Sequence, residues 1–233
     1  MIDIHNHLLP GIDDGSKSMS DSIKVLKKLK DIGFDTIILT PHYINQSKYS
    51  SNRENNIKLL EELKEEVKNN DIDIKLYLGN EIYYDENIYK FLREKKISTL
   101  NDSKYLLIEI PMSGIAPGYE EVFDSLIKKG YKVILAHPER YYSFQSKYDL
   151  VEELYESGIL FQCNLESILG SYGLRSKKLF KRLLKEKKIS FLATDIHHNK
   201  RDFSVYDKAK KKICKYITEE EYKKLLETNH LFD

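Results

Sequence analysis

The chain has 233 residues, of which 41% are hydrophobic, enough for one domain with a core of its own. Its 38 basic and 37 acidic residues give a net charge of +1, so no global field gathers nucleic acid. Two separated cysteines exclude a disulfide framework and a cysteine-rich zinc module. No secretory signal and no apolar run of about 20 residues is visible, which predicts a cytoplasmic protein without membrane insertion.

Short apolar segments alternate with longer amphipathic ones along the chain. The predicted strands are Met1–His5, Thr36–Leu39, Ile74–Leu78, Tyr105–Ile110, Lys132–Ala136, Leu160–Asn164 and Ser190–Ala193. The predicted helices are Ser20–Ile32, Arg53–Asn69, Glu86–Glu94, Tyr119–Lys129, Lys147–Ser157, Ser176–Glu186, Val205–Lys215 and Glu219–Glu227. Strands that are apolar without alternation are typical of parallel pairing. We therefore expect an α/β fold, a distorted (β/α)7 barrel in a single domain over residues 1–233, with an open doubly wound sheet as the alternative.

The Lys/Glu-rich runs at 61–68 and 177–188 are interpreted as solvated helix faces, the commoner meaning of such runs.

Histidines and acidic residues gather at the carboxyl ends of the predicted strands. Six of the seven histidines lie there, namely His5, His7, His42, His137, His197 and His198, whereas His230 lies in the C-terminal tail. Glu81, Glu109 and Asp195 follow or end strands in the same way. Because active sites of parallel α/β folds form at this edge, we expect these side chains to meet.

The spacing within two of these strand ends suits a metal ion. In an extended segment, residues two apart point to one face, so His5 and His7 can meet one cation. Asp195 and His197 repeat that spacing at another strand end. Imidazole and carboxylate are ligands for zinc, manganese or iron. One such pair is weak by itself, but the repetition predicts a metal centre.

Several of these residues have a second interpretation. Glu109 lies in an apolar strand, where a charge needs a cation or another partner. A single histidine such as His42 or His137 is as often a polar cap as a ligand. Asp13, after Pro10-Gly11, is also typical of a turn. Cys163 is predicted to be a core residue.

Two arginines are candidates for binding an anion. Arg140 follows His137 closely, and a guanidinium beside a metal cluster suits two oxygens of a phosphate. A salt bridge to Glu139, or a plain surface charge, is the alternative. Arg201 is the weaker candidate. A cysteine-based phosphatase needs an arginine six positions after the cysteine, and neither Cys163 nor Cys214 is followed by one, which excludes this class. The chain also has no Gly-Lys-Ser/Thr phosphate loop, which disfavours an NTPase.

These segments together resemble a known superfamily. The matching segments are Asp3-Ile-His-Asn-His7, Thr40-Pro-His42, Gly79-Asn-Glu81, the strand ending in Glu109, His137-Pro-Glu-Arg140 and Asp195-Ile-His197. They resemble the polymerase-and-histidinol-phosphatase (PHP) superfamily. The segment from Leu8 to Gly15 and Tyr141 after Arg140 resemble its branch of bacterial metal-dependent protein tyrosine phosphatases, linked to capsule and exopolysaccharide synthesis. The similarity covers essentially the whole chain.

The resemblance implies a distorted barrel with three divalent ions, often manganese, with iron and zinc as alternatives. The implied ligands are His5, His7, Glu81 and Asp195 for the first ion, Glu81 as a bridge with Glu109 and His137 for the second, and Asp14, His42 and His197 for the third. Arg140 would bind the phosphoryl group. The stretch that leads to a second arginine looks shorter than in the family, which puts Arg201 in doubt, and His198 has no implied role.

The resemblance also implies hydrolysis of phosphotyrosine on protein, with a membrane-associated tyrosine autokinase as the expected partner. Bound divalent ions lower the pKa of water, and the resulting hydroxide would attack phosphorus in line. The ions and Arg140 would neutralise charge on the phosphoryl oxygens. Histidinol phosphate phosphatase, or another small phosphomonoesterase of this fold, is the nearest alternative. A nuclease module, disfavoured by the balanced charge, and a non-catalytic kinase-docking module are the others. Oligomeric state is left open.

Overall fold

The computed structural model describes residues 1–198 and 202–227. Its strands are β1 (Ile2–Asp3), β2 (Thr36–Leu39), β3 (His42–Tyr43), β4 (Lys75–Leu78), β5 (Glu81–Tyr83), β6 (Tyr105–Glu109), β7 (Lys132–Ala136), β8 (Leu160–Asn164) and β9 (Phe191–Ala193). Its α-helices are α1 (Met19–Asp31), α2 (Arg53–Asn69), α3 (Ile88–Arg93), α4 (Tyr119–Lys128), α5 (Tyr142–Ser146), α6 (Asp149–Glu156), α7 (Leu174–Lys185), α8 (Ser204–Ile213) and α9 (Glu219–Lys224). Three 3-10 turns are η1 (Leu100–Asp102), η2 (Pro138–Arg140) and η3 (Leu165–Leu169).

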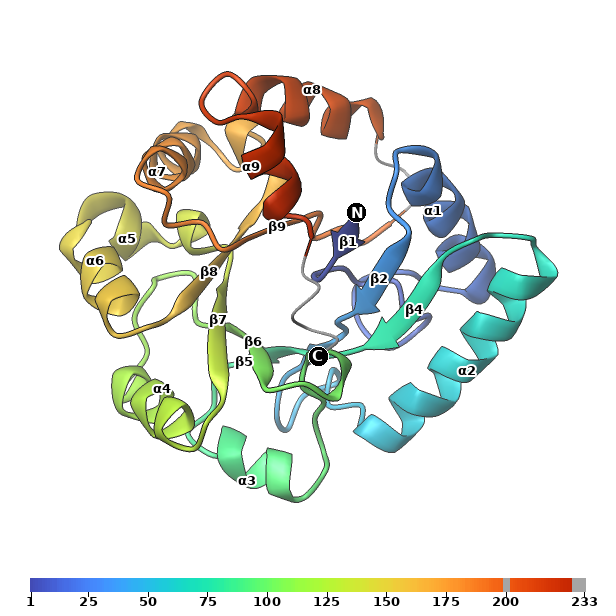
Figure 1. Ribbon diagram of the computed structural model, residues 1–233. Coiled ribbons are helices and arrows are strands. Elements are labelled where there is room, and N and C mark those ends of the chain that lie inside the picture. The colour runs from blue at the N-terminus through green and yellow to red at the C-terminus, as the bar shows by residue number, and fades with distance from the viewer. Residues whose placement is uncertain (199–201, 228–233) are drawn as a thin grey trace.

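The strands form a closed ring with the helices outside it (Figure 1). Every strand pair is parallel, in the orders β1-β2-β4 and β3-β5-β6-β7-β8-β9. A parallel bridge between Asn6 and Ile196 joins the first and last strand positions, and the backbone N–H of His7 donates to the carbonyl of Ile196 at 2.9 Å. The predicted barrel is thus confirmed over the open sheet.

Two of the seven strand positions are split, which the sequence analysis did not predict. The second position breaks at Pro41, which has no N–H to give to a ladder, and the third breaks at Gly79. A Cβ at Gly79 would lie 2.6 Å from a methyl of Leu100, so only glycine fits this bend. After each break the chain continues in the other sheet, where His42 pairs with Glu81. The breaks therefore place these two candidate ligands side by side.

The barrel interior is apolar at one end and polar at the other. A small cluster that includes Ile38, Leu107 and Ile134 fills the end where the strands begin. Along β6, alternate side chains point the same way, so Glu109 lies two residues beyond Leu107 on the inner face. The larger core lies between the strands and the helices and contains Cys163, as predicted. This layering confines the charged side chains to the carboxyl ends of the strands.

The helices agree with the sequence pattern apart from α5, which was not predicted. Helix α2 has the predicted bounds, and its N-cap Asn52 accepts a hydrogen bond from the backbone N–H of Asn55. No helix is predicted over residues 142–146, which fold into the single turn of α5 just after η2. Within the described ranges, no helix combines the length and apolar character needed to cross a bilayer.

Candidate metal centre

Glu81 lies at the centre of a cluster of histidines at the carboxyl ends of the strands. One of its oxygens, Oε1, lies 3.2 Å from Nε2 of His5 and 3.1 Å from Nε2 of His137. The other, Oε2, lies 3.3 Å from Nε2 of His7 and 2.9 Å from Nδ1 of His42. Four imidazoles thus surround one carboxylate that is almost fully buried.

All nine residues predicted as ligands lie in this cluster, in overlapping groups. Atoms that lie within 4.8 Å of one another define four sets: His7, Asp14, His42 and His197; His5, His7 and Glu81; His5, His137 and Asp195; and His42, Glu81 and Glu109. The expected ligands of the third ion, Asp14, His42 and His197, form one of these sets together with His7. The first and second expected sets are divided differently, because Asp195 groups with His137, and Glu109 with His42. His137 nevertheless lies 3.7 Å from Glu109.

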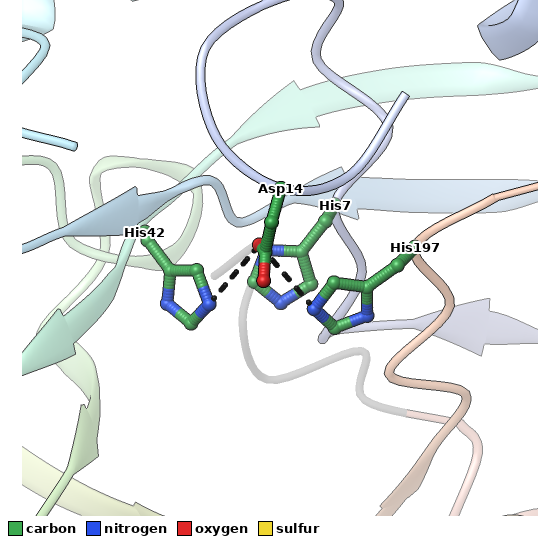
Figure 2. A group of neighbouring side chains, drawn as sticks. All are labelled: His7, Asp14, His42 and His197. Atoms are coloured by element: carbon green, nitrogen blue, oxygen red, sulfur yellow. Dashed lines mark ion pairs between the residues drawn. The ribbon is translucent and has the colours of Figure 1, made fainter. Parts of the chain in front are cut away.

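Asp14 closes the cluster on the side that faces solvent. Its Oδ1 lies 3.5 Å from Nε2 of His42 and 3.6 Å from Nε2 of His197. Figure 2 shows the three imidazoles converging from separate segments below the loop that carries Asp14. The side chain of Asp14 is 49% exposed, whereas that of His7 is fully buried. The centre is therefore reached from the Asp14 side.

A second layer of side chains fixes the two most buried histidines. Nδ1 of His5 lies 2.7 Å from Oε1 of Gln162, and Nδ1 of His7 lies 2.7 Å from Oδ2 of Asp13. Because both partners are acceptors, each ring carries its proton on Nδ1 and turns Nε2 toward the cluster. Among the residues that the structure describes, neither Nε2 atom has a hydrogen-bond partner. Gln162 has no signal in the sequence that would have identified it.

Asp13 serves both as a turn residue and as part of this layer. Its Oδ1 accepts a hydrogen bond from the N–H of Gly15 at 2.9 Å, which is the turn the sequence indicated. Its Oδ2 also accepts from the N–H of His42 at 2.9 Å. A Cβ at Gly15 would lie 1.9 Å from the carbonyl oxygen of His7, so glycine is required for this close approach.

Asp195 faces the cluster with one oxygen and is held by the other. Oδ1 lies 3.5 Å from Nε2 of both His5 and His7. Oδ2 accepts hydrogen bonds from Nη1 of Arg140 at 3.0 Å and from Nδ2 of Asn164 at 2.7 Å. Asp195 has a φ of +51°, a conformation that is costly for residues other than glycine and that clusters at functional sites.

Arg140 lies at the rim of the cluster, where it contacts an acidic residue other than the one expected. Its guanidinium pairs with Asp195 and also lies over the ring of Tyr172, with the carbon 4.7 Å from the ring centre. Glu139, the partner that the alternative proposed, is buried and accepts hydrogen bonds from Asn164 and from the 3-10 turn η3. Arg201 lies outside the described residues, and His198 is exposed.

Burial and mutual attraction shift the pKa values of the cluster in opposite directions. Burial acts to raise the pKa of Glu81, but the neighbouring His5 and His42 outweigh it and hold this pKa well below its usual range. Burial acts to lower the pKa of His5, yet Glu81 and Asp195 raise it to about 9. The pKa of His197 falls to about 4 because of burial and the nearby His7. In the absence of a cation, protons on the imidazoles thus balance the carboxylates.

The donor set fits divalent metal ions. Among the described residues, buried and unpartnered ring nitrogens of His5, His7 and His42 lie beside carboxylate oxygens, and those are the donors that zinc, manganese and iron accept. Buried carboxylates are costly unless cations compensate them. A cation that replaces the protons would satisfy both kinds of donor at once.

The closed ring of parallel strands, with histidines and carboxylates at its carboxyl ends, is a β/α barrel of the PHP type. The family model described as "Capsular polysaccharide synthesis, CpsB/CapC" matches residues 1–231. This chain belongs to the CpsB/CapC family.

Relatives and solved structures agree with this assignment. CapC from Staphylococcus aureus is 36% identical over 197 residues, which cover 84% of this chain and 77% of CapC. Tyrosine-protein phosphatase YwqE from Bacillus subtilis is 32% identical over 223 residues, covering 95% and 85% of the two chains. A chain from the crystal structures of YwqE and of CpsB from Streptococcus pneumoniae, described as unique metal-dependent tyrosine phosphatases, superimposes with a TM-score of 0.86. It is 31% identical, and the match covers 95% of this chain and 90% of that one.

A more distant structure shares the fold alone. Histidinol phosphate phosphatase from Lactococcus lactis superimposes with a TM-score of 0.62 at 16% identity, over 93% of both chains.

Proposed function

We propose that this protein is a metal-dependent protein tyrosine phosphatase, a phosphoric monoester hydrolase. The observation that carries the proposal is the position of Arg140, a guanidinium at the solvent-facing rim of a buried set of metal donors. A divalent centre with an arginine at its edge suits a phosphoryl group, whose charge must be neutralised during transfer. The names of YwqE and CpsB as tyrosine-protein phosphatases favour phosphotyrosine.

Different residues of the chain have different roles in the proposed reaction. His5, His7, Asp14, His42, Glu81, Glu109, His137, Asp195 and His197 would hold the ions. When bound, divalent ions supply a hydroxide nucleophile near neutral pH and neutralise phosphoryl charge. Arg140 binds phosphoryl oxygens, and its contacts with Asp195 and Tyr172 keep the guanidinium at the rim. Gln162 and Asp13 orient the imidazoles of His5 and His7.

The surroundings of the site suit a substrate that is part of a protein. Ile115 is 58% exposed and Tyr142 is 68% exposed. They follow β6 and β7, and the N–H of Tyr142 donates to the carbonyl of Met112, which brings the two loops together. An apolar rim beside Arg140 can hold the residues that flank a phosphotyrosine. Tyrosinate is also an adequate leaving group, because the pKa of tyrosine is about 10.

The finer parts of the proposal rest on the family resemblance. They are three divalent ions, with manganese as the expected metal, and a membrane-associated tyrosine autokinase as the protein that is dephosphorylated. The family description supports a role in capsular polysaccharide synthesis, and control of exopolysaccharide synthesis rests on the resemblance. Histidinol phosphate phosphatase is the second candidate, and the shared barrel is the observation in its favour.

The test compares two substrates on metal-stripped protein as manganese is titrated back. One substrate is a phosphotyrosine peptide and the other is histidinol phosphate. We expect hydrolysis of the peptide only with metal, and a higher kcat/KM for the peptide than for histidinol phosphate. A large preference for histidinol phosphate would keep the centre but overturn the substrate. No turnover of either substrate with metal bound would overturn the enzyme proposal in favour of a docking module.

A further inference from the structure

Helices α7 and α8, on the outside of the barrel, carry a dense group of positive charges (Figure 1). Residues 170–185 contain six basic residues and residues 208–218 contain five, and neither segment contains an aspartate or a glutamate. This local excess contrasts with the net charge of +1 of the whole chain. An ordinary solvated helix face mixes both signs of charge, and these two segments do not.

Two lysines of this region lie over one exposed tyrosine, and two more lie close to each other nearby. The ammonium groups of Lys181 and Lys185 lie 5.6 Å and 5.5 Å from the centre of the Tyr216 ring, which is 37% exposed. Lys212 lies close enough to Lys177 that partial burial and this second ammonium group lower the pKa of Lys177. We call Lys177, Lys181, Lys185, Lys212 and Tyr216 the basic face.

Carboxylates do not neutralise the basic face in the part of the chain that the structure describes. None of its four ammonium groups has an ion pair with a carboxylate within 4.0 Å there. Arg182, also on α7, shows the contrast, because it pairs with Glu186 at 2.8 Å. Cations that crowd one another and lack counter-charges attract an anionic ligand.

The basic face adjoins the arginine that is proposed to bind phosphate. Helix α7 packs against η2, the turn that carries Arg140, and against η3. Nζ of Lys177 donates to the carbonyl of Leu169 at the end of η3, at 3.3 Å. Three residues further along, the ring of Tyr172 lies under Arg140. A chain seated at Arg140 therefore reaches Lys177 by crossing only the loop at residues 170–173.

We propose that the basic face is a docking surface for an acidic segment of the phosphotyrosine protein, whose aspartate and glutamate side chains flank the phosphotyrosine. The inference rests on the proposed function and adds a substrate preference to it. The contact of α7 with the turn that carries Arg140 favours a peptide over a bilayer as the ligand of the basic face, because a peptide bound at Arg140 can continue toward Lys177. Extended chain spans about 3.3 Å per residue, so acidic residues about four to eight positions from the phosphotyrosine are within reach.

The test uses two phosphotyrosine peptides that differ only in these flanks, acidic in one and amide in the other. Their Kd values are measured by fluorescence anisotropy on metal-stripped protein, and their kcat/KM values on the manganese-loaded enzyme. We expect the acidic peptide to bind roughly tenfold more tightly at low salt. The advantage should shrink at high salt because mobile ions screen exposed charges.

Two triple variants with the same change in net charge locate the effect. Lys177→Gln/Lys181→Gln/Lys212→Gln removes three cations of the basic face, whereas Lys24→Gln/Lys75→Gln/Lys104→Gln removes three exposed lysines elsewhere. The first variant should lose most of the preference for the acidic peptide, and the second should keep it. Circular dichroism and Tm verify that both variants fold.

Three outcomes would overturn the docking surface: equal Kd values for the two peptides, equal losses in the two variants, or face-dependent binding of phosphatidylserine vesicles without a peptide preference. Failure of the proposed function looks different. In that case neither peptide is hydrolysed with metal bound, while the anisotropy measurement still reports whether the basic face prefers the acidic peptide.

Discussion

Arg140 and Asp195 share a hydrogen bond of 3.0 Å at the rim of the histidine cluster. The bond divides the roles of the two oxygens of Asp195, because Oδ2 is occupied and Oδ1 alone faces His5 and His7. It also holds the guanidinium beside the cluster before a substrate arrives. One ion pair thus links the group proposed to bind phosphate to the groups proposed to bind metal.

Replacing Arg140 by alanine should lower kcat on a phosphotyrosine peptide by about 10²–10³-fold, the usual cost of removing one stabilising donor. Arg140→Lys should recover little, because an ammonium group cannot contact two oxygens as a planar guanidinium does. Steady-state kinetics with saturating manganese measures both effects. Turnover like that of the wild type in the alanine variant would exclude Arg140 from phosphate binding, whereas wild-type turnover in the lysine variant would show that a positive charge alone is sufficient.

Gln162→Leu should weaken manganese binding by about 10–100-fold, because His5 loses the acceptor that orients its ring. Isothermal titration calorimetry on metal-stripped protein measures the Kd. Gln162→Glu is the matched control, since its carboxylate still accepts from Nδ1 of His5 and should retain most of the affinity. Equal Kd values for the leucine variant and the wild type would contradict a role for Gln162.

Manganese should raise the Tm of the wild type, because a ligand that binds only the folded state adds about 2.7 kcal/mol at 100 times its Kd. Glu81→Gln should remove most of this rise, because Glu81 contacts four imidazoles and its charge would be lost. Glu61→Gln, an exposed change on α2, is the control and should keep the full rise. Differential scanning calorimetry with and without manganese separates the cases.

Gly114→Ala should destabilise the protein by about 1–3 kcal/mol. Its φ is +76°, and an added Cβ would lie 2.1 Å from Oγ of Ser143. Gly130→Ala is the control, since its φ is +86° but no atom of the described residues lies within 4 Å of the added Cβ. The control should cost only the left-handed conformation, about 1 kcal/mol. Urea unfolding of both variants measures the difference, and equal losses would mean that the loop yields to the added methyl.

Glu186 should stabilise the fold above about pH 4.5 and lose that contribution as the pH falls toward 2. Burial acts to raise its pKa, but hydrogen bonds from Tyr148, Arg182 and Lys188 lower it to about 2 from an ordinary 4.5. Protonation in the unfolded chain therefore precedes protonation in the folded one. The side chain is 34% exposed, so the contribution stays below about 1 kcal/mol.

The measurement for Glu186 is urea unfolding of wild type and Glu186→Gln between pH 6 and pH 3. The difference in unfolding free energy should narrow as the pH falls. A constant difference over this range would show that the stability contribution of Glu186 does not depend on its charge.

The barrel, and the clustering of the nine candidate ligands at one end of it, could be predicted because local sequence signals indicate both. Metal binding by these nine residues stays a prediction. Apolar strands end in histidine or acid, and the bounds predicted for β2, β7 and β8 agree with the structure. The split strands could not be predicted, because the need for glycine at position 79 arises from Leu100, which is distant in sequence. Short α5 also escaped, since a single turn has no periodicity to detect.

The side chains that hold the cluster from outside could not be predicted for a related reason. Gln162 and Tyr172 are ordinary residues in their own segments, and only the folded chain brings them to His5 and Arg140. Asp13 was weighed as a turn residue, and its bond to His7 was not foreseen. The choice of ligands for each ion, and the extent of the domain over residues 1–233, stay predictions.

The bridge between Asn6 and Ile196 has a consequence for synthesis on the ribosome. The cluster combines His5 and His7 with Asp195 and His197, which leave the ribosome much later than the two histidines. The N–H of Ile2 also donates to the carbonyl of Leu226. A nascent chain therefore completes the centre only after β9 has closed the ring. The complete set of candidate ligands is therefore available to metal only after that step.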